Sequence, residues 1–246
     1  MKSQSTFNNM PLAARIAIML FALLGTAALV YALTSHMGFE PGRLLLLMAG
    51  AAVCARAKVT LYKASTISLL TSVVLLAVIK EGLAAALMVG VFGVMVQTVV
   101  PSKKLVLHQL AFNFGMIGVT VSATWFTHQS LAAARLAGPI STESIAVLFA
   151  SFVYFLGNSL SVSMIIALSN KVSMAEVWLK HFMCSAPSFL LAGLLSLSVV
   201  ALMGALSSQM FSVIVCLAAV IGIVYYTSIR LAANSVGRGL SIASAR

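Results

Sequence analysis

Residues 69–96 read LLTSVVLLAVIKEGLAAALMVGVFGVMV and contain only two charged side chains, Lys80 and Glu81. On either side of this pair lies an apolar run close to the roughly 20 residues that an α-helix needs to cross the hydrocarbon of a bilayer. Gly82 follows the charged pair and marks a turn. We therefore expect two membrane-spanning helices, at about 59–79 and 82–100, joined at the membrane surface.

The same pattern of long apolar runs and short polar connections extends over the whole chain of 246 residues. Apolar residues make up 61% of the chain and charged residues only 8%, whereas soluble domains carry about 25% charged residues. The runs are too long for barrel strands of about ten residues. We predict an all-α, polytopic integral membrane protein with a single transmembrane domain over residues 1–246 and no soluble domain. Its eight spans are expected at about 14–34, 43–57, 59–79, 82–100, 105–127, 145–168, 184–205 and 209–229. The second span is short and could instead be tilted, partly buried or re-entrant.

The distribution of basic residues predicts the orientation of these spans. The chain has 15 Lys and Arg against 4 Glu and a net charge of +11. The cations stand singly or in pairs between apolar runs, so the clustered basic face of a nucleic-acid-binding protein is not expected. With eight spans and a cytoplasmic N-terminus, 12 cations lie in cytoplasmic segments and only Arg43, Lys80 and Arg135 lie outside. The positive-inside rule thus favours a bacterial inner-membrane protein with both termini in the cytoplasm. A seven-span alternative, in which the second run does not cross, moves the N-terminus outside and keeps the C-terminus inside.

The inventory of reactive side chains argues against catalysis. Aspartate is absent, and the four acids are Glu40, Glu81, Glu143 and Glu176. No two of them share a helix face, which excludes acid–base chemistry by paired carboxylates. Neither a metal-binding nor a nucleotide-binding motif is present. We expect no catalytic residues and no metal site, and a cofactor held by apolar contacts alone would leave no motif in the sequence.

Uncharged polar residues lie at one depth in three of the expected spans. Counted from the cytoplasmic ends at about 1.5 Å per residue, their depth is roughly 12–15 Å. Polar groups at such depth must face protein, water or a ligand. Two interpretations remain open, an interhelical hydrogen-bond cluster and the lining of a small-molecule pocket. The candidate ligand-binding residues are Ser65, Ser68 and Ser72 on one face of the third span, Asn113 on the fifth, and Tyr154 and Asn158 on the sixth.

Two further groups of residues suggest packing and lipid contacts. The fourth span carries a stripe of small residues, Gly82, Ala86, Gly90 and Gly93. Such a stripe allows close helix approach, either inside the chain or between the copies of a homo-oligomer. Lys103, Lys104 and His108 cluster at the cytoplasmic ends of the fourth and fifth spans, where we expect them to pair with anionic lipid headgroups.

The segment between the sixth and seventh spans has a local helix signal. Ser173-Met174-Ala175-Glu176 reads as a capping box, and Lys180 lies one turn beyond Glu176. The segment is either a short amphipathic helix at the cytoplasmic surface or the first turns of the seventh span.

From about Val59 to Arg230 the pattern resembles the multi-span membrane regions that precede cytoplasmic HD-type phosphohydrolase or diguanylate cyclase domains in bacterial signalling proteins. The residues that carry this resemblance are Val59-Thr60, Phe112-Asn113, Tyr154-Phe155, Asn158, Ala167-Leu168-Ser169 and Val177-Trp178. In those proteins an output domain follows the last span, whereas this sequence ends at Arg246. The resemblance therefore implies a stand-alone sensor that acts through a partner, or a membrane module recruited to another complex.

The expected function is that of a non-catalytic accessory, sensor or scaffold subunit in the membrane, which contacts another membrane or cytoplasmic protein. The alternative is a small-molecule binding or transport protein that uses the polar residues of spans three, five and six. For this alternative, the glycine-bearing fourth span is faintly similar to the substrate-capture subunits of bacterial vitamin uptake systems.

Overall fold

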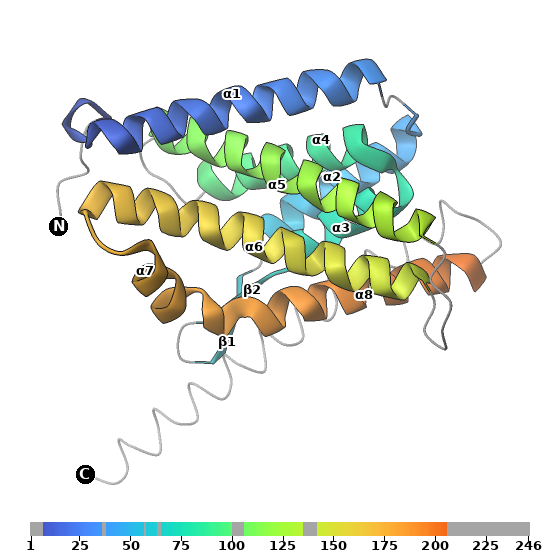
Figure 1. The fold of residues 1–246 in the computed structure, drawn as a ribbon. Coiled ribbons are helices and arrows are strands. Elements are labelled where there is room, and N and C mark those ends of the chain that lie inside the picture. Colours follow the sequence, from blue (N-terminus) through green and yellow to red (C-terminus); the bar gives the residue numbers. More distant parts are fainter. Residues whose placement is uncertain are drawn as a thin grey trace, which may run out of the picture.

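The computed structural model describes residues 7–35, 38–56, 58–62, 65–99, 106–134 and 142–205. The described chain is α-helical apart from one short hairpin (Figure 1). The expected span at 209–229 lies outside the described residues. The elements in chain order are η1 (Phe7–Asn9), α1 (Leu12–Ser35), α2 (Pro41–Arg56), β1 (Lys58–Tyr62), β2 (Ser65–Ser68), α3 (Leu70–Lys80), α4 (Gly82–Val99), α5 (Leu107–Ala133), α6 (Thr142–Asn170), α7 (Met174–His181), η2 (Met183–Ser185) and α8 (Ala186–Ala205).

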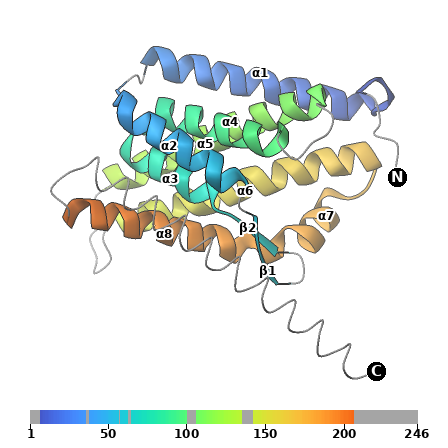
Figure 2. The same cartoon turned by 180° about the vertical axis from the view of Figure 1, so that it is seen from behind.

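The long helices lie side by side and alternate in direction, as Figure 1 and the reverse view in Figure 2 show. Helices α1, α3, α5 and α8 run one way, and α2, α4 and α6 run the other. The bundle therefore has two ends. We call them the Glu81 end, where α3 turns into α4 and α5 into α6, and the His108 end, where α5 begins and α6 gives way to α7.

Helix α3 forms the centre of the bundle. Every residue from Leu70 to Val78 is buried, and α3 packs against α2, α4, α5, α6 and α8. Its eleven residues extend only about 16 Å at 1.5 Å per residue, which is too short to cross the hydrocarbon.

The expected single helix over 59–79 is therefore wrong in its first half. There, β1 pairs antiparallel with β2. The two strand sequences, KVTLY and STIS, are rich in the β-branched and aromatic residues that favour strands. The average hydropathy of the run conceals this local preference. Strand β2 of the hairpin packs against α8 and η2.

The number of membrane-crossing helices in the described chain is smaller than the eight predicted. Four helices, α1, α4, α5 and α6, are long and apolar enough to cross a bilayer. Helices α7 and α8, bent by 63° at the break between them, count as a fifth if they form one broken span. Helix α2 has 16 residues and agrees with the short second run of the sequence. The structure thus supports a multi-helix membrane protein.

Helix α1 packs on the bundle through one face only. Gly25 lies against Gly115 and Gly118 of α5, and a Cβ atom at Gly115 would collide with the backbone of Phe21. This close crossing is typical of small residues at helix interfaces in membranes. The other face of α1 exposes large apolar side chains, among them Leu23 at 67%, which fits contact with lipid.

Candidate functional site

A layer of buried hydroxyl groups joins α3, α6 and α8. The side chains of Thr71 on α3 and Tyr154 on α6 are hydrogen-bonded to each other. From α8, the Ser196 hydroxyl donates to the backbone oxygen of Ser72 at 3.0 Å. These four residues are at most 4% exposed, so the layer is closed to solvent. The Ser72 hydroxyl finds no hydrogen-bond partner among the described residues.

The structure brings only part of the predicted polar set to this layer. Ser72 and Tyr154 belong to it, whereas Asn113 donates from Nδ2 to Thr98 Oγ1 at 2.9 Å and joins α5 to the end of α4. Asn158 is half-buried on α6, one turn from Tyr154. The shared helical face predicted for Ser65, Ser68 and Ser72 is wrong, because Ser65 and Ser68 belong to strand β2.

Thr71 and Ser196 complete the layer, and neither of them was identified from the sequence as a candidate site residue. Threonine and serine are common in apolar helices because their hydroxyls bond to the preceding turn, as Ser196 also does to Ala192. Nothing local distinguishes a serine that reaches another helix. The chemistry available in the layer is hydrogen bonding by neutral groups. The described residues hold no group of three or more His, Cys, Asp or Glu that could bind a metal ion.

The Glu81 end is held together by contacts of its carboxylates with Arg43 and His128. Arg43 on α2 contacts Glu40 and Glu81, each with an N–O distance of 3.1 Å. The Glu81 side chain is only 2% exposed. Its burial raises the pKa of this carboxyl, while the charge of Arg43 opposes the rise. His128 Nε2 on α5 lies 3.3 Å from Glu143 Oε1 at the start of α6. These contacts tie α2 to the α3–α4 turn, and α5 to α6.

At the His108 end, the capping box opens a separate short helix, as the first interpretation of the segment predicted. The Ser173 hydroxyl accepts the backbone N–H of Glu176 at 3.5 Å, and Lys180 pairs with Glu176. This helix, α7, is bent by 63° from α8. It therefore differs in direction from the span that follows it.

One face of α7 is fixed to the bundle and the other is exposed. Trp178 Nε1 donates to Ser159 Oγ on α6 at 2.9 Å, and Val177 is buried. On the opposite side, Leu179 is 57% exposed and Met183, just after the helix, is 49% exposed. Lys180 lies on the exposed side with them. We call Leu179, Lys180 and Met183 the α7 surface.

Three of the four residues of the predicted stripe lie inside the bundle, whereas Gly82 is half-buried at the start of α4 with open space around its Cα. Ala86, Gly90 and Gly93 are buried. A Cβ atom at Gly90 would contact Ile117 on α5, and one at Gly93 would collide with Leu70 on α3. This placement favours internal packing over a contact between copies of the chain.

Of the residues expected to contact lipid headgroups, Lys103 and Lys104 lie outside the described residues. His108 is half-buried on the first turn of α5, with its ring 5.8 Å from that of Phe7. A comparison of the chain with protein-family models, characterised proteins and solved structures finds no match. The fold and the geometry above are therefore the basis for any functional assignment.

Proposed function

We propose that this chain is a non-catalytic subunit of a bacterial inner membrane, of the sensor or scaffold type, which contacts a protein partner through the α7 surface. The observation that carries the proposal is the two-sided placement of α7. Trp178 fixes one face of α7 to α6, while the other face presents apolar and charged side chains together. Such a mixture at a fixed position suits a protein contact at the membrane surface.

The charge distribution supports a cytoplasmic location for α7. Of the seven Lys and Arg in the described residues, two lie at the Glu81 end, Arg43 and Lys80. The other five lie toward the His108 end. Three of the four acids are at the Glu81 end. Under the positive-inside rule this distribution orients the His108 end, and α7 with it, toward the cytoplasm.

A chain of aromatic contacts connects α7 to the buried layer. The ring centroids of Trp178 and Phe155 are 6.2 Å apart, and those of Phe155 and Phe189 are 5.2 Å apart. Phe189 in turn lies 6.1 Å from Tyr154, which belongs to the hydroxyl layer. These contacts give a continuous path of packed side chains between the layer and α7, along which a sensor could transmit a change in the packing of α3, α6 and α8.

The test is site-specific photocrosslinking in native membranes. A photoreactive residue at Leu179 is expected to give a discrete crosslinked product, and the same residue at Leu23 on the exposed face of α1 is the matched control. Adding Trp178→Ala is expected to abolish the product, because α7 loses its hydrogen bond to Ser159. The proposal is wrong if Leu179 gives no product, or if Leu23 gives the same one.

A second candidate is a small-molecule binding protein that uses the hydroxyl layer. It is supported by the Ser72 hydroxyl of this layer, which is buried without a partner among the described residues. Screening by ligand-induced thermal shift tests it. A true ligand of this layer is expected to lose its shift in Ser72→Ala and to keep it in Ser198→Ala, a serine on the exposed side of α8.

A further inference from the structure

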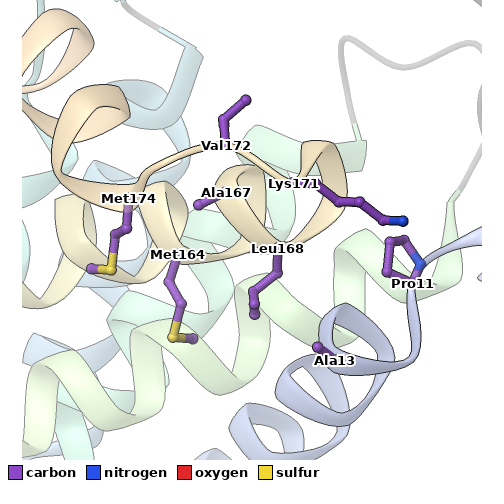
Figure 3. A pocket seen from close by; sticks show the side chains of 8 residues that line it. All are labelled: Pro11, Ala13, Met164, Ala167, Leu168, Lys171, Val172 and Met174. Carbon is purple, nitrogen blue, oxygen red and sulfur yellow. The ribbon is translucent and has the colours of Figure 1, made fainter.

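An apolar groove of about 450 Å³ opens at the His108 end between α1, the end of α6 and the start of α7 (Figure 3). Met164, Ala167 and Leu168 of α6 form one wall, and Pro11 and Ala13 form the other. Ligand sites commonly have volumes of about 300–1,000 Å³. One cation, Lys171, stands at the edge of this apolar lining, and its side chain extends toward Pro11.

The backbone holds Lys171 in this position. Its φ of +56° is the only positive φ among the described residues other than glycine. The N–H of Val172 bonds back to the carbonyl of Ala167 at 3.1 Å, which closes the end of α6 as a Schellman-type cap. Glycine or asparagine is usual at such a position. A lysine there places a cation at the mouth of the groove at some conformational cost.

No carboxylate of a side chain is left to neutralise Lys171. All four acids lie in the described residues, and each is already paired: Glu40 and Glu81 with Arg43, Glu143 with His128, and Glu176 with Lys180. A second cation, Arg15, lies one turn beyond Pro11 on α1, and its buried Nε has no hydrogen-bond partner among the described residues. An anionic group of another molecule that enters the groove would therefore find Lys171 without a competing carboxylate.

We propose that this groove binds one anionic glycerophospholipid, with an acyl chain along Met164, Ala167 and Leu168 and the phosphate against Lys171. The position supports a lipid as the occupant. The neighbouring α1 residues Leu12 and Ile16 are 63% and 44% exposed, so the groove opens beside a surface that faces the bilayer. The groove is lined by other residues than the lipid-contacting ones expected from the sequence, and the proposal does not depend on a protein partner at α7.

The test is native mass spectrometry of the purified full chain in a neutral detergent, with phosphatidylglycerol and phosphatidylcholine of identical acyl chains as probes. We expect about fivefold tighter binding of phosphatidylglycerol, the effect of one cation beside an anionic headgroup. Lys171→Asn is expected to remove that preference, because asparagine keeps the left-handed backbone without the charge. Lys180→Asn, outside the groove, is the matched control and is expected to keep it. Lys171→Gly replaces Lys171→Asn if the latter does not fold.

A second variant tests the acyl chain. Ala13 is exposed and lines the groove, so a tryptophan at this position fills the groove without disturbing the core. Ala13→Trp is therefore expected to weaken the binding of both lipids. Equal binding of the two lipids, or an unchanged preference in Lys171→Asn, would overturn the proposal. If inorganic phosphate displaces phosphatidylglycerol and Ala13→Trp has no effect on lipid binding, the groove is a site for a free anion. That result would overturn the proposal as well. If the wild type and Ala13→Trp retain the same amount of bound detergent, no acyl or detergent chain enters the groove.

Discussion

The two ends of the bundle place their charged side chains in opposite ways. At the Glu81 end, the Arg43–Glu81 ion pair and the His128–Glu143 contact join different elements, and one partner of each is almost fully buried, Glu81 at 2% and His128 at 5%. At the His108 end, the pair of Glu176 and Lys180 lies within one short helix, and both side chains are more than half exposed. The Glu81 end is thus fixed by tertiary contacts, while the His108 end keeps its polar groups available for other molecules.

This difference determines what a mutation does at each end. A buried ion pair adds little net stability, but removing one partner leaves an uncompensated charge in a medium of low polarity. An exposed pair is screened by water, and its removal changes little. Equivalent substitutions at the two ends therefore give very different results if the comparison is right.

The largest effect is expected for Arg43→Leu. Glu81 then remains buried without the Arg43 guanidinium beside it, and the free energy of unfolding is expected to fall by about 3–5 kcal/mol. Lys180→Leu, the matched substitution at the other end, is expected to unfold like the wild type. Denaturation of both variants in the same detergent measures the difference. Equal losses in the two variants would show that the ends do not differ.

The pH dependence of stability tests the same end with a smaller effect. Burial raises the pKa of Glu81 above its ordinary value of 4.5, so the folded chain binds this proton more tightly than the unfolded chain does. The contribution of Glu81 to stability therefore increases as the pH falls through the raised pKa, and it is complete below 4.5. In Glu81→Gln this contribution is absent.

The measurement is the thermal midpoint of both proteins between about pH 8 and about pH 5. The midpoint of the wild type is expected to rise relative to that of Glu81→Gln as the pH falls. A difference that stays constant, or that changes in the other direction, would mean that Arg43 outweighs the effect of burial.

What the sequence could and could not predict follows the same division between local and tertiary features. Helices α1, α4, α5 and α6 were found because the length of an apolar run is a local property. The capping box at Ser173 was found because its two residues are three positions apart. The hairpin before α3 was missed because averaging over 59–79 hid two strand-forming stretches.

The contacts that build the candidate sites were missed for a different reason. Arg43 with Glu81, Thr71 with Tyr154, and Ser196 with Ser72 join segments that only the packing of α3 brings together. The sequence showed that polar groups at depth need partners, but it held no information on which ones they meet. From the sequence, Lys171 is one of the 12 expected cytoplasmic cations, because neither its left-handed backbone nor the groove beside it has a signal in the sequence.

At the His108 end, the attachment of α7 is expected to have an intermediate effect on stability. Trp178→Phe keeps the aromatic packing and removes the hydrogen bond to Ser159, at a cost of about 0.6–2 kcal/mol. Ser159→Ala removes the same bond from the other side. If the bond is the common cause, the double variant is expected to lose no more than the larger single loss. Additive losses would indicate two independent contacts. The measurement is equilibrium unfolding followed by the circular dichroism of the helices, a signal that does not depend on the tryptophan that is replaced.

The smallest effect is expected for Glu176→Gln. The Lys180 side chain lowers the pKa of Glu176, first through their hydrogen bond and then through its charge. The pH dependence of this contribution to stability has the opposite sign to that of Glu81. Any stability from the pair is present above pH 4.5 and is lost as the pH falls through the lowered pKa. Since both side chains are exposed to solvent, we expect the thermal midpoints of Glu176→Gln and the wild type to coincide within replicate error from about pH 8 to about pH 5. A clear drop in the variant would show that α7 is held by its own ion pair as well as by Trp178, and the contrast between a fixed end and an available end would then not extend to this helix.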